Sequence, residues 1–354
     1  MQPLLRGSLG RAWASQRQSR RAPGAGGLLG ALGAAAAAAA AAAGLAATAA
    51  ADAADAGEAL PTDKLACHLA AAPPRTPAVL VACGSFNPPT AAHLRMFDLA
   101  VAALAQVALR AARAAGRALA GAAPRTARPP PDRRLPLSRQ RGYDVWGCYM
   151  SPVADAYGKD GLAPAEHRLA MCRLAAAETA GVMVDAWEAR QPGHTRTLEV
   201  LRHVAASLEA SLGAVHAAGL AAAAAAGSGH AGDSGGSRAP PVPRVMLLCG
   251  ADLLATLAEP GLWRQPDAIL AEHGLVCVTR AGTDAARLLD QPGSVLHTHR
   301  EHVLLVEEPV PSELSSTKAR ELLAAGQPVR WLVPDAVAAY AREHRLYAAG
   351  GGAG

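Results

Sequence analysis

Short, continuously apolar runs recur along the chain and alternate with longer segments of helical periodicity. The first such run, residues 78–83, ends at a glycine. An apolar run of this length predicts a strand that is buried on both faces, as in parallel sheets. The other runs of this kind are residues 145–150, 182–185, 245–249, 275–279 and 303–306.

Segments with helical patterns separate these predicted strands, at residues 91–109, 163–177, 198–212 and 316–325. Strands that alternate with helices predict an α/β fold, in which a parallel sheet carries helices on both faces. Ligands of such sheets bind beyond the carboxyl ends of the strands. We therefore expect the functional residues in the segments that directly follow strands.

Low-complexity segments set the expected domain boundaries. Residues 1–76 form an extension rich in alanine and arginine, residues 77–348 form the domain, and residues 349–354 form a flexible tail. Two stretches inside the domain differ in composition from the rest. The stretch near 110–141 is rich in alanine, arginine and proline, and the stretch near 213–243 is rich in alanine, glycine and serine. We expect both to be surface insertions or linkers.

The start of the chain carries the excess of positive charge. Its first 51 residues hold five arginines and no acidic residue, and the formal net charge of the whole chain is +5. Two interpretations remain open: a transit peptide for the mitochondrion or plastid, or a disordered tail on a protein of the cytoplasm or nucleus. Residues 28–50 are apolar but consist mostly of alanine and glycine, so we expect no stable membrane span.

The composition narrows the classes of function. Hydrophobic residues make up 51% of the chain but aromatic residues only 3%, and no basic stripe is interleaved with aromatics. A nucleic-acid partner is therefore not indicated. None of the six cysteines forms a C-x-x-C pair, and we expect buried free thiols of an intracellular protein.

The segment from Gly84 to His93 follows the first predicted strand and opens a predicted helix. Gly84 and Ser85 allow the backbone to approach a phosphate closely, and the free N–H groups at the helix start favour an anion. Thr90 and His93 are three residues apart and lie on one side of the first turn. Spacing alone predicts either an anion site or an ordinary strand-to-helix turn.

The same segment reads Gly-Ser-Phe-Asn-Pro-Pro-Thr-Ala-Ala-His-Leu-Arg-Met-Phe. It resembles the signature of eukaryotic nicotinamide or nicotinic acid mononucleotide adenylyltransferases, of the H-x-G-H nucleotidyltransferase superfamily. Thr90 and His93 match the positions of the two histidines of that motif. The resemblance implies a Rossmann-like parallel sheet of the nucleotidyltransferase type.

Four later blocks, in the same order as in the family, extend the resemblance over residues 77–347. Residues 151–162 are similar to a block whose lysine contacts phosphate, although Gly158 and Asp160 replace the lysines that often flank it. Residues 185–190 resemble a block whose tryptophan lies near the nicotinamide ring, and a cationic ring over an aromatic face is a sound recognition mode. Residues 248–263 and 314–320 resemble the remaining two blocks.

The resemblance implies adenylyl transfer from ATP to nicotinamide mononucleotide or its nicotinic acid analogue, giving NAD or its deamido form and pyrophosphate. It implies Mg²⁺ with the ATP, without a direct protein ligand, and we expect a homo-oligomer. The implied catalytic residues are His93, Lys159 and Arg320. The implied ATP site comprises Gly84, Ser85, Phe86, Thr90, His93, Gly250, Asp252, Ser315, Ser316, Thr317 and Arg320. The implied mononucleotide site comprises Ser85, Lys159, Trp187, Thr197, Leu262, Trp263, Arg280 and Glu308.

Two other functions are weighed against this one. Another nucleotidyltransferase of the superfamily, such as a pantetheine-phosphate or cytidylyl enzyme, would not need Trp187 and Trp263. An inactive relative that acts as a chaperone or binding module would not need His93, Lys159 and Arg320.

Overall fold

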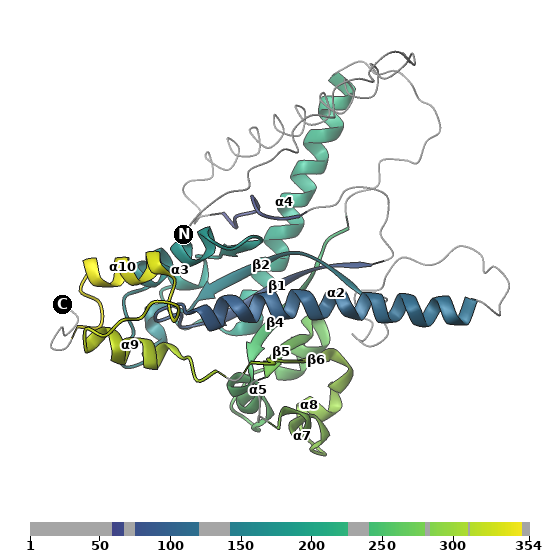
Figure 1. The fold of residues 1–354 in the computed structure, drawn as a ribbon. Coiled ribbons are helices and arrows are strands. Elements are labelled where there is room, and N and C mark those ends of the chain that lie inside the picture. The colour runs from purple at the N-terminus through teal and green to yellow at the C-terminus, as the bar shows by residue number, and fades with distance from the viewer. Residues whose placement is uncertain are drawn as a thin grey trace, which may run out of the picture.

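In the computed structural model, residues 59–66, 75–119, 142–225, 241–279, 284–310 and 312–348 are described. Within these residues six strands form a parallel sheet (Figure 1). They are β1 (Thr76–Gly84), β2 (Tyr143–Pro152), β3 (Val182–Val184), β4 (Arg244–Gly250), β5 (Leu275–Thr279) and β6 (Val303–Glu307). Each lies where an apolar run predicts it, so the predicted α/β fold with a parallel sheet is confirmed.

The order of the strands determines where a ligand can bind. It is β3-β2-β1-β4-β5-β6, so the chain builds one half of the sheet outward from β1 and then returns to start the other half at β4. The connections that leave β1 and β4 diverge to opposite faces of the sheet. A crevice between the carboxyl ends of two such strands is the usual ligand site of this architecture.

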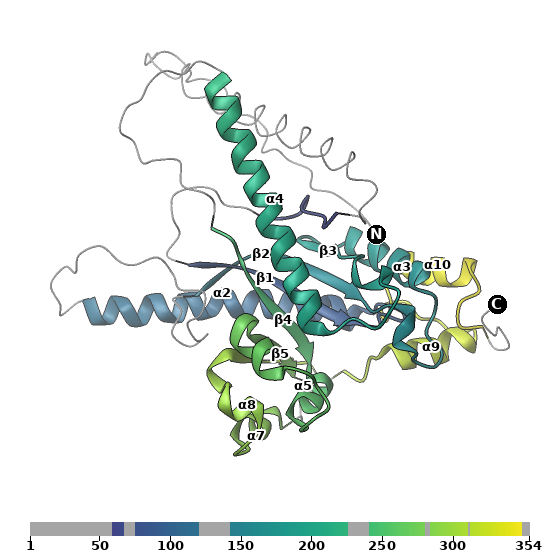
Figure 2. The ribbon, with the colours of Figure 1, turned by 180° about the vertical axis from the view of Figure 1, so that it is seen from behind.

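Helices cover both faces of the sheet (Figures 1 and 2). The long helix α2 (Ala91–Leu119) and α3 (Ala165–Ala177) pack on one face, and α4 (Thr197–Ala225) and α5 (Ala251–Ala258) pack on the other. Helix α6 (Pro266–Ala268) lies between α5 and β5, and α7 (Ala285–Asp290) and α8 (Val295–Thr298) lie between β5 and β6. Helices α9 (Ser316–Ala324) and α10 (Asp335–Glu343) follow β6. Helix α10 packs against α3, which brings the end of the chain near the carboxyl edge of the sheet.

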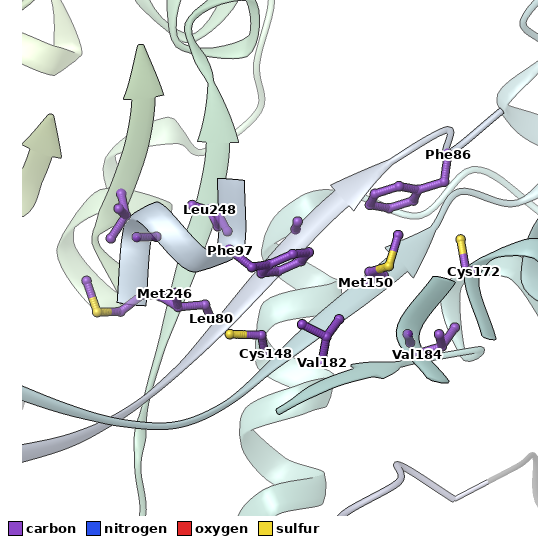
Figure 3. Close-up of a cluster of buried hydrophobic side chains, with 14 of the residues drawn as sticks. Leu80, Phe86, Phe97, Cys148, Met150, Cys172, Val182, Val184, Met246 and Leu248 are labelled. Carbon is purple, nitrogen blue, oxygen red and sulfur yellow. The ribbon is translucent and has the colours of Figure 1, made fainter. Parts of the chain in front are cut away.

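Alternate residues of each central strand enter different cores. Leu80 of β1 packs with Phe97 of α2 on one face (Figure 3), whereas Val79 and Val81 pack with Leu201 of α4 on the other. All five residues are almost completely buried. Burial on both faces explains why the strands read as unbroken apolar runs rather than as alternating patterns.

Two helices extend beyond their predicted ends. Helices α2 and α4 continue to Leu119 and Ala225, into the stretches 110–141 and 213–243 that we expected to be insertions or linkers. Alanine has the highest helix propensity, so these alanine-rich segments prolong the helices that precede them. Residues 120–141 and 226–240 of these stretches, like residues 1–58 and 349–354, lie outside the described residues.

Residues 59–66, part of the predicted extension, contact the domain. The Leu60 side chain is buried in the core on the α4 face. Tyr149 donates its hydroxyl to the carbonyl of Pro61 at 2.6 Å, and Lys64 donates to the carbonyl of Ala176 at 2.6 Å, at the end of α3. These contacts attach the segment to β2, to α3 and to the core beneath α4.

Five cysteines confirm the prediction of free thiols. Cys148, Cys172, Cys249 and Cys277 are free and buried, and Cys83 is free and partly exposed. Burial raises the pKa of the Cys148 thiol to about 12, so this group remains neutral. Cys67 lies outside the described residues.

Candidate active site

A cavity of about 420 Å³ opens at the point where the strand order reverses. Its floor comes from the carboxyl ends of β1 and β4, with Cys83 and Gly84 from one strand and Cys249 and Gly250 from the other. Apolar side chains of Leu99, Leu248, Leu253, Val278 and Leu314 add to its walls. Its volume and mixed lining suit a small organic ligand.

Three helices begin at the wall of this cavity. Ala91 is the first residue of α2, and Gly250 and Ser315 are the N-cap residues of α5 and α9. The Ser315 hydroxyl accepts from the Lys318 N–H at 3.2 Å. Ala91, Gly250 and Ser315 all line the cavity. The N-terminus of a helix presents unpaired N–H groups and the positive end of the helix dipole. The cavity is therefore suited to an anion such as a polyphosphate.

His93 is held in one tautomer by Thr90. The backbone N–H of Thr90 donates to Nδ1 of His93 at 3.0 Å, and the Thr90 hydroxyl lies 2.9 Å from the same nitrogen. Because Nδ1 accepts a hydrogen bond, the proton of the neutral ring is on Nε2. Both residues line the cavity.

The loop that leads to His93 has a strained backbone. Phe86 is not a glycine, yet it adopts a φ of 45°, in the left-handed region. Such a conformation costs about 1–3 kcal/mol and persists only where the surroundings impose it. The Phe86 side chain is buried, and its ring lies 5.2 Å from the His93 ring.

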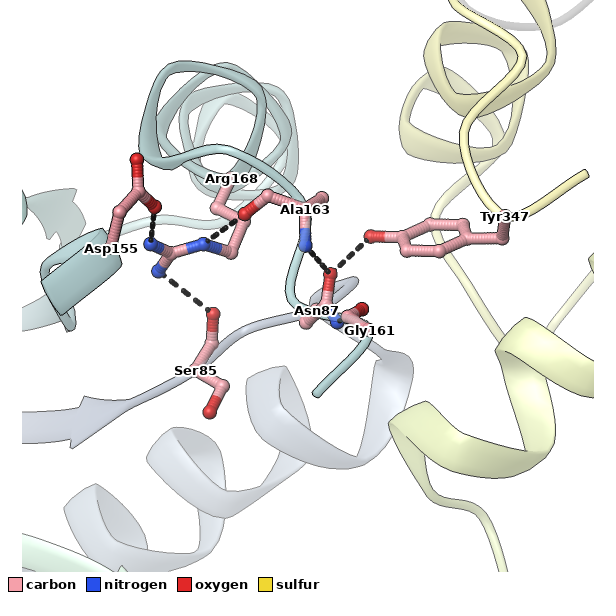
Figure 4. Close-up of polar contacts among 7 residues, drawn as sticks. All are labelled: Ser85, Asn87, Asp155, Gly161, Ala163, Arg168 and Tyr347. Atoms are coloured by element: carbon pink, nitrogen blue, oxygen red, sulfur yellow. Dashed lines mark hydrogen bonds and ion pairs between the residues drawn. The ribbon is translucent and has the colours of Figure 1, made fainter. Parts of the chain in front are cut away.

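Buried polar contacts hold this loop in place. Arg168 is fully buried and donates to the carbonyls of Ala163 at 2.7 Å and Ser85 at 3.3 Å, and to the Asp155 carboxylate at 2.8 Å (Figure 4). A buried guanidinium is tolerated only when its hydrogen bonds are satisfied in this way. Asn87 is also buried and forms a second set of such contacts.

Helix α9 is fastened to the same loop. The Ser316 hydroxyl donates to the Pro88 carbonyl at 2.8 Å, and the Arg320 guanidinium donates to the Asn87 carbonyl at 2.8 Å. Arg320 also lies 3.4 Å from the Thr317 hydroxyl. Ser315 and Ser316 line the cavity, and Thr317 and Arg320 follow them on α9.

An ion pair lies at the rim of the cavity. The Arg95 guanidinium donates through Nη2 to Oε1 of Glu308 at 2.8 Å and through Nε to Oε2. This bond and the charge of Arg95 hold the pKa of the Glu308 carboxyl below its usual value. The structure thus places Glu308 beside the predicted ATP residues Gly250 and Asp252, which line the same cavity.

The other predicted residues lie outside the cavity wall. Lys159 is exposed on the segment between β2 and α3, and Thr197 is the first residue of α4. Leu262 is exposed, while Trp263 packs on the core and donates to the Thr256 hydroxyl at 3.1 Å. Arg280 lies outside the described residues.

Trp187 stacks on a histidine. Its ring lies 4.2 Å from the ring of His203, and the two planes are inclined by 9°. The Asp185 carboxylate accepts from the Trp187 backbone N–H at 3.0 Å. Burial lowers the pKa of His203, so its ring favours the neutral form.

A buried acid follows Trp187. The Glu188 side chain is buried, and its carboxylate accepts from the hydroxyl of Ser151, at the end of β2, at 3.1 Å. Burial raises the pKa of Glu188 to about 7, although the Ser151 hydrogen bond opposes this change. The acid therefore titrates near neutral pH at the carboxyl edge of the sheet.

The sequence did not identify Asn87, Arg95 and Arg168 as site residues. Asn87 and Arg95 lie inside the 14-residue motif, and that proximity was the available signal. Their roles depend on partners distant in sequence, such as Glu308 for Arg95. Local spacing carries no information about such partners.

The sequence of the chain is similar to those of several known proteins. The cytidylyltransferase-like family model matches residues 138–322. The nicotinamide/nicotinic acid mononucleotide adenylyltransferase of Oryza sativa subsp. japonica is 38% identical over 291 residues, which cover 81% of this chain and 93% of that protein. The protein of the same name from Arabidopsis thaliana is 34% identical (81% and 97% covered), and nicotinamide/nicotinic acid mononucleotide adenylyltransferase 1 of Bos taurus is 36% identical (77% and 89% covered).

Proposed function

Since this chain belongs to the nicotinamide/nicotinic acid mononucleotide adenylyltransferase family, we propose that it joins ATP to nicotinamide mononucleotide or to its nicotinic acid analogue. A 5′-phosphate oxygen of the mononucleotide attacks the α-phosphorus of ATP. The bond from that phosphorus to the bridging oxygen breaks, and pyrophosphate leaves. The products are NAD, or its deamido form, and pyrophosphate.

The convergence of three helix N-termini on one cavity is the observation that carries this proposal. The triphosphate of ATP is the most highly charged part of either substrate, and helix N-termini stabilise such anions. The apolar walls formed by Leu248, Leu253 and Val278 suit the adenine base. Asp252 lines the same wall and suits the ribose hydroxyls.

His93 is assigned to the α-phosphate. With Nδ1 occupied by Thr90, the ring offers the N–H of Nε2 as a donor. Negative charge builds on the phosphoryl oxygens during transfer, so a preorganised donor binds the transition state more tightly than the substrate. No covalent intermediate is needed, because both substrates are positioned for direct transfer.

The β- and γ-phosphates are assigned to the start of α9 and to a lysine. Ser316 and Thr317 supply hydroxyls and backbone N–H groups, and Arg320 lies one turn further on. Lys159 follows β2 on an exposed segment and is assigned to the phosphates by its match to the family block. Cations around the leaving pyrophosphate stabilise its charge.

The pyridine ring is assigned to the aromatic residues that follow β3 and α5. Trp187 presents a ring already oriented by its stack on His203, and a cationic pyridinium is attracted to such a face. Thr197, Leu262 and Trp263 border this side by their match to the family blocks. Recognition of this ring would distinguish the family from other nucleotidyltransferases.

Mg²⁺ is assigned to the triphosphate rather than to a protein cage. Among the described residues, no group of three or more His, Cys, Asp or Glu side chains is arranged to hold a metal ion. The cavity wall carries two carboxylates, Asp252 and Glu308, and Asp252 would help to hold a cation that binds with the triphosphate. When bound with ATP, Mg²⁺ neutralises part of the triphosphate charge.

One assay tests the proposal. Purified full-length protein is incubated with ATP, Mg²⁺ and either mononucleotide, and the dinucleotide and pyrophosphate are measured. We expect both products in equal amounts, and much less turnover with CTP in place of ATP. A folded protein that forms no dinucleotide would contradict the enzyme assignment and favour a binding or chaperone role.

Assembly and compartment are further parts of the proposal. We infer a homo-oligomer, which sedimentation velocity of the full-length protein would detect. In the described residues, every helix falls short of the length or the apolar character needed to cross a bilayer. The choice between an organelle and the cytoplasm or nucleus depends on residues 1–58, which lie outside the described residues.

A further inference from the structure

Asn87, in the loop between β1 and α2, joins three separate parts of the chain through its side-chain amide (Figure 4). Its Nδ2 donates to the Gly161 carbonyl at 2.8 Å, and its Oδ1 accepts from the Ala163 N–H at 3.1 Å. The hydroxyl of Tyr347 completes the set, 2.7 Å from Oδ1. Asn87 is only 3% exposed, so these bonds are shielded from water.

The orientation of this amide is fixed by its partners. A backbone N–H such as that of Ala163 can only donate, so the atom facing it must be the amide oxygen. The Gly161 carbonyl can only accept, so it must face the amide nitrogen. Tyr347 therefore acts as the donor in its bond to Asn87, and burial raises the pKa of its hydroxyl, which keeps the donated proton in place.

Tyr347 lies in a turn that follows α10. Its own backbone adopts a φ of 65°, in the left-handed region that a tyrosine rarely occupies. The side chain packs with the cluster formed by α3, α9 and α10. Unusual backbone conformations are retained where the surrounding structure needs the side chain in one place.

The segment next to Asn87 carries the proposed chemistry. Phe86 has the strained φ of 45°, and Thr90 orients His93 through the 3.0 Å bond to Nδ1. Arg320 holds the Asn87 carbonyl from the side of α9, while Tyr347 holds its side chain. The loop is therefore fixed between two elements from the end of the chain.

We propose that Tyr347 is a positioning residue for adenylyl transfer, which acts through Asn87 to keep Thr90 and His93 at the α-phosphate. This inference rests on the function proposed above. The turn after α10 then belongs to the active site, although it touches no substrate. The hydroxyl of Tyr347 should affect the rate of adenylyl transfer more than the affinity for ATP.

The test compares two variants of the full-length protein that each lose one phenolic hydroxyl. Tyr347→Phe removes the bond to Asn87 but leaves Oδ1 paired with Ala163. Tyr340→Phe is the matched control, because Tyr340 in α10 pairs with Nδ1 of His167 at 2.9 Å and does not contact the loop. We expect Tyr347→Phe to lower kcat about tenfold with KM for ATP changed less than twofold, and Tyr340→Phe to change neither.

Two more measurements separate positioning from general stability. In nitrogen NMR spectra of histidine-labelled protein, the ring signals of His93 should shift in Tyr347→Phe and stay unchanged in Tyr340→Phe. In a folded Asn87→Ala background, Tyr347→Phe should have no further effect on kcat.

Unchanged kcat and unchanged His93 signals in Tyr347→Phe would overturn the inference. It would also be overturned if Tyr347→Phe lowered kcat by the same factor in the Asn87→Ala background as in the wild type. The NMR result does not depend on turnover. If the wild-type protein has no activity, the proposed function is refuted. The NMR comparison would still decide whether Tyr347 positions His93.

Discussion

The backbone N–H of Thr90 donates to Nδ1 of His93 at 3.0 Å, within the first turn of α2. This bond makes the histidine a donor at Nε2 before any substrate arrives. Preorganisation of this kind avoids the cost of reorienting a ring or a water molecule during the reaction.

Replacement of His93 should reduce the rate of transfer strongly. We expect His93→Ala to lower kcat by about 100- to 1,000-fold, the usual effect of removing one donor to a developing oxyanion. Steady-state kinetics with both mononucleotides would measure it. His299→Ala is a suitable control, because that ring pairs with Asp267 at 3.1 Å and is not among the residues that line the cavity. Full turnover by His93→Ala would remove His93 from the mechanism.

A side chain at Gly250 should block the nucleotide. A Cβ atom built there meets no atom within 4 Å, and the residue has an ordinary φ of −89°, so the backbone permits Gly250→Leu. The leucine would occupy the cavity and raise KM for ATP by about tenfold or more. Gly213→Leu provides the control, since Gly213 is exposed on α4 with equally open space. Calorimetry would measure the affinity of each variant for ATP. Equal affinities of Gly250→Leu and Gly213→Leu would show that the nucleotide binds elsewhere.

The buried acid Glu188 should make stability depend on pH. Its pKa is about 7 in the folded protein, mainly because of burial, against about 4.3 in an unfolded chain. The folded state therefore binds more protons between these values, and the free energy of unfolding falls as pH rises through this window.

The isosteric variant Glu188→Gln lacks this titration. Between pH 5 and 8, the wild type should lose about 2 to 3 kcal/mol of unfolding free energy relative to that variant, as measured in urea. Glu259→Gln, at an exposed residue, should follow the wild type. Parallel curves for the wild type and Glu188→Gln would show that Glu188 is ionised throughout.

Residues 59–66 should contribute to folding stability. A chain begun at residue 59 retains the buried Leu60 and the bonds that Pro61 and Lys64 make with the domain, whereas a chain begun at residue 67 loses them. We expect the shorter chain to be less stable by about 3 kcal/mol, from apolar burial and hydrogen bonds together. Equal melting temperatures would show that the segment is dispensable.

If the first 51 residues act as a transit peptide, their arginines should direct a reporter to an organelle. A fluorescent protein fused to residues 1–60 should accumulate in the mitochondrion or plastid, and a copy with the five arginines replaced by glutamine should not. A diffuse signal from the unmodified fusion would favour the alternative, an untargeted tail.

Much of the fold could be predicted from the sequence, because β1 and β4 are buried on both faces and therefore read as uninterrupted apolar runs. The ends of α2 and α4 could not, since alanine-rich segments suit both a linker and a prolonged helix. Thr90 and His93 were predictable because their partnership spans one helical turn.

The bond between Asn87 and Tyr347 was not predictable, because it joins residues 260 positions apart and depends on how α10 docks. Sequence spacing records neighbours along an element. It does not show which distant polar side chain the fold places against a loop.

Helices α2 and α4 both start at the carboxyl edge of the sheet, where the cavity lies, and run away from it (Figures 1 and 2). Chain length gained at their far ends therefore accumulates on the side opposite the chemistry. A reporter domain spliced between α2 and β2, or between α4 and β4, is therefore expected to leave the cavity intact.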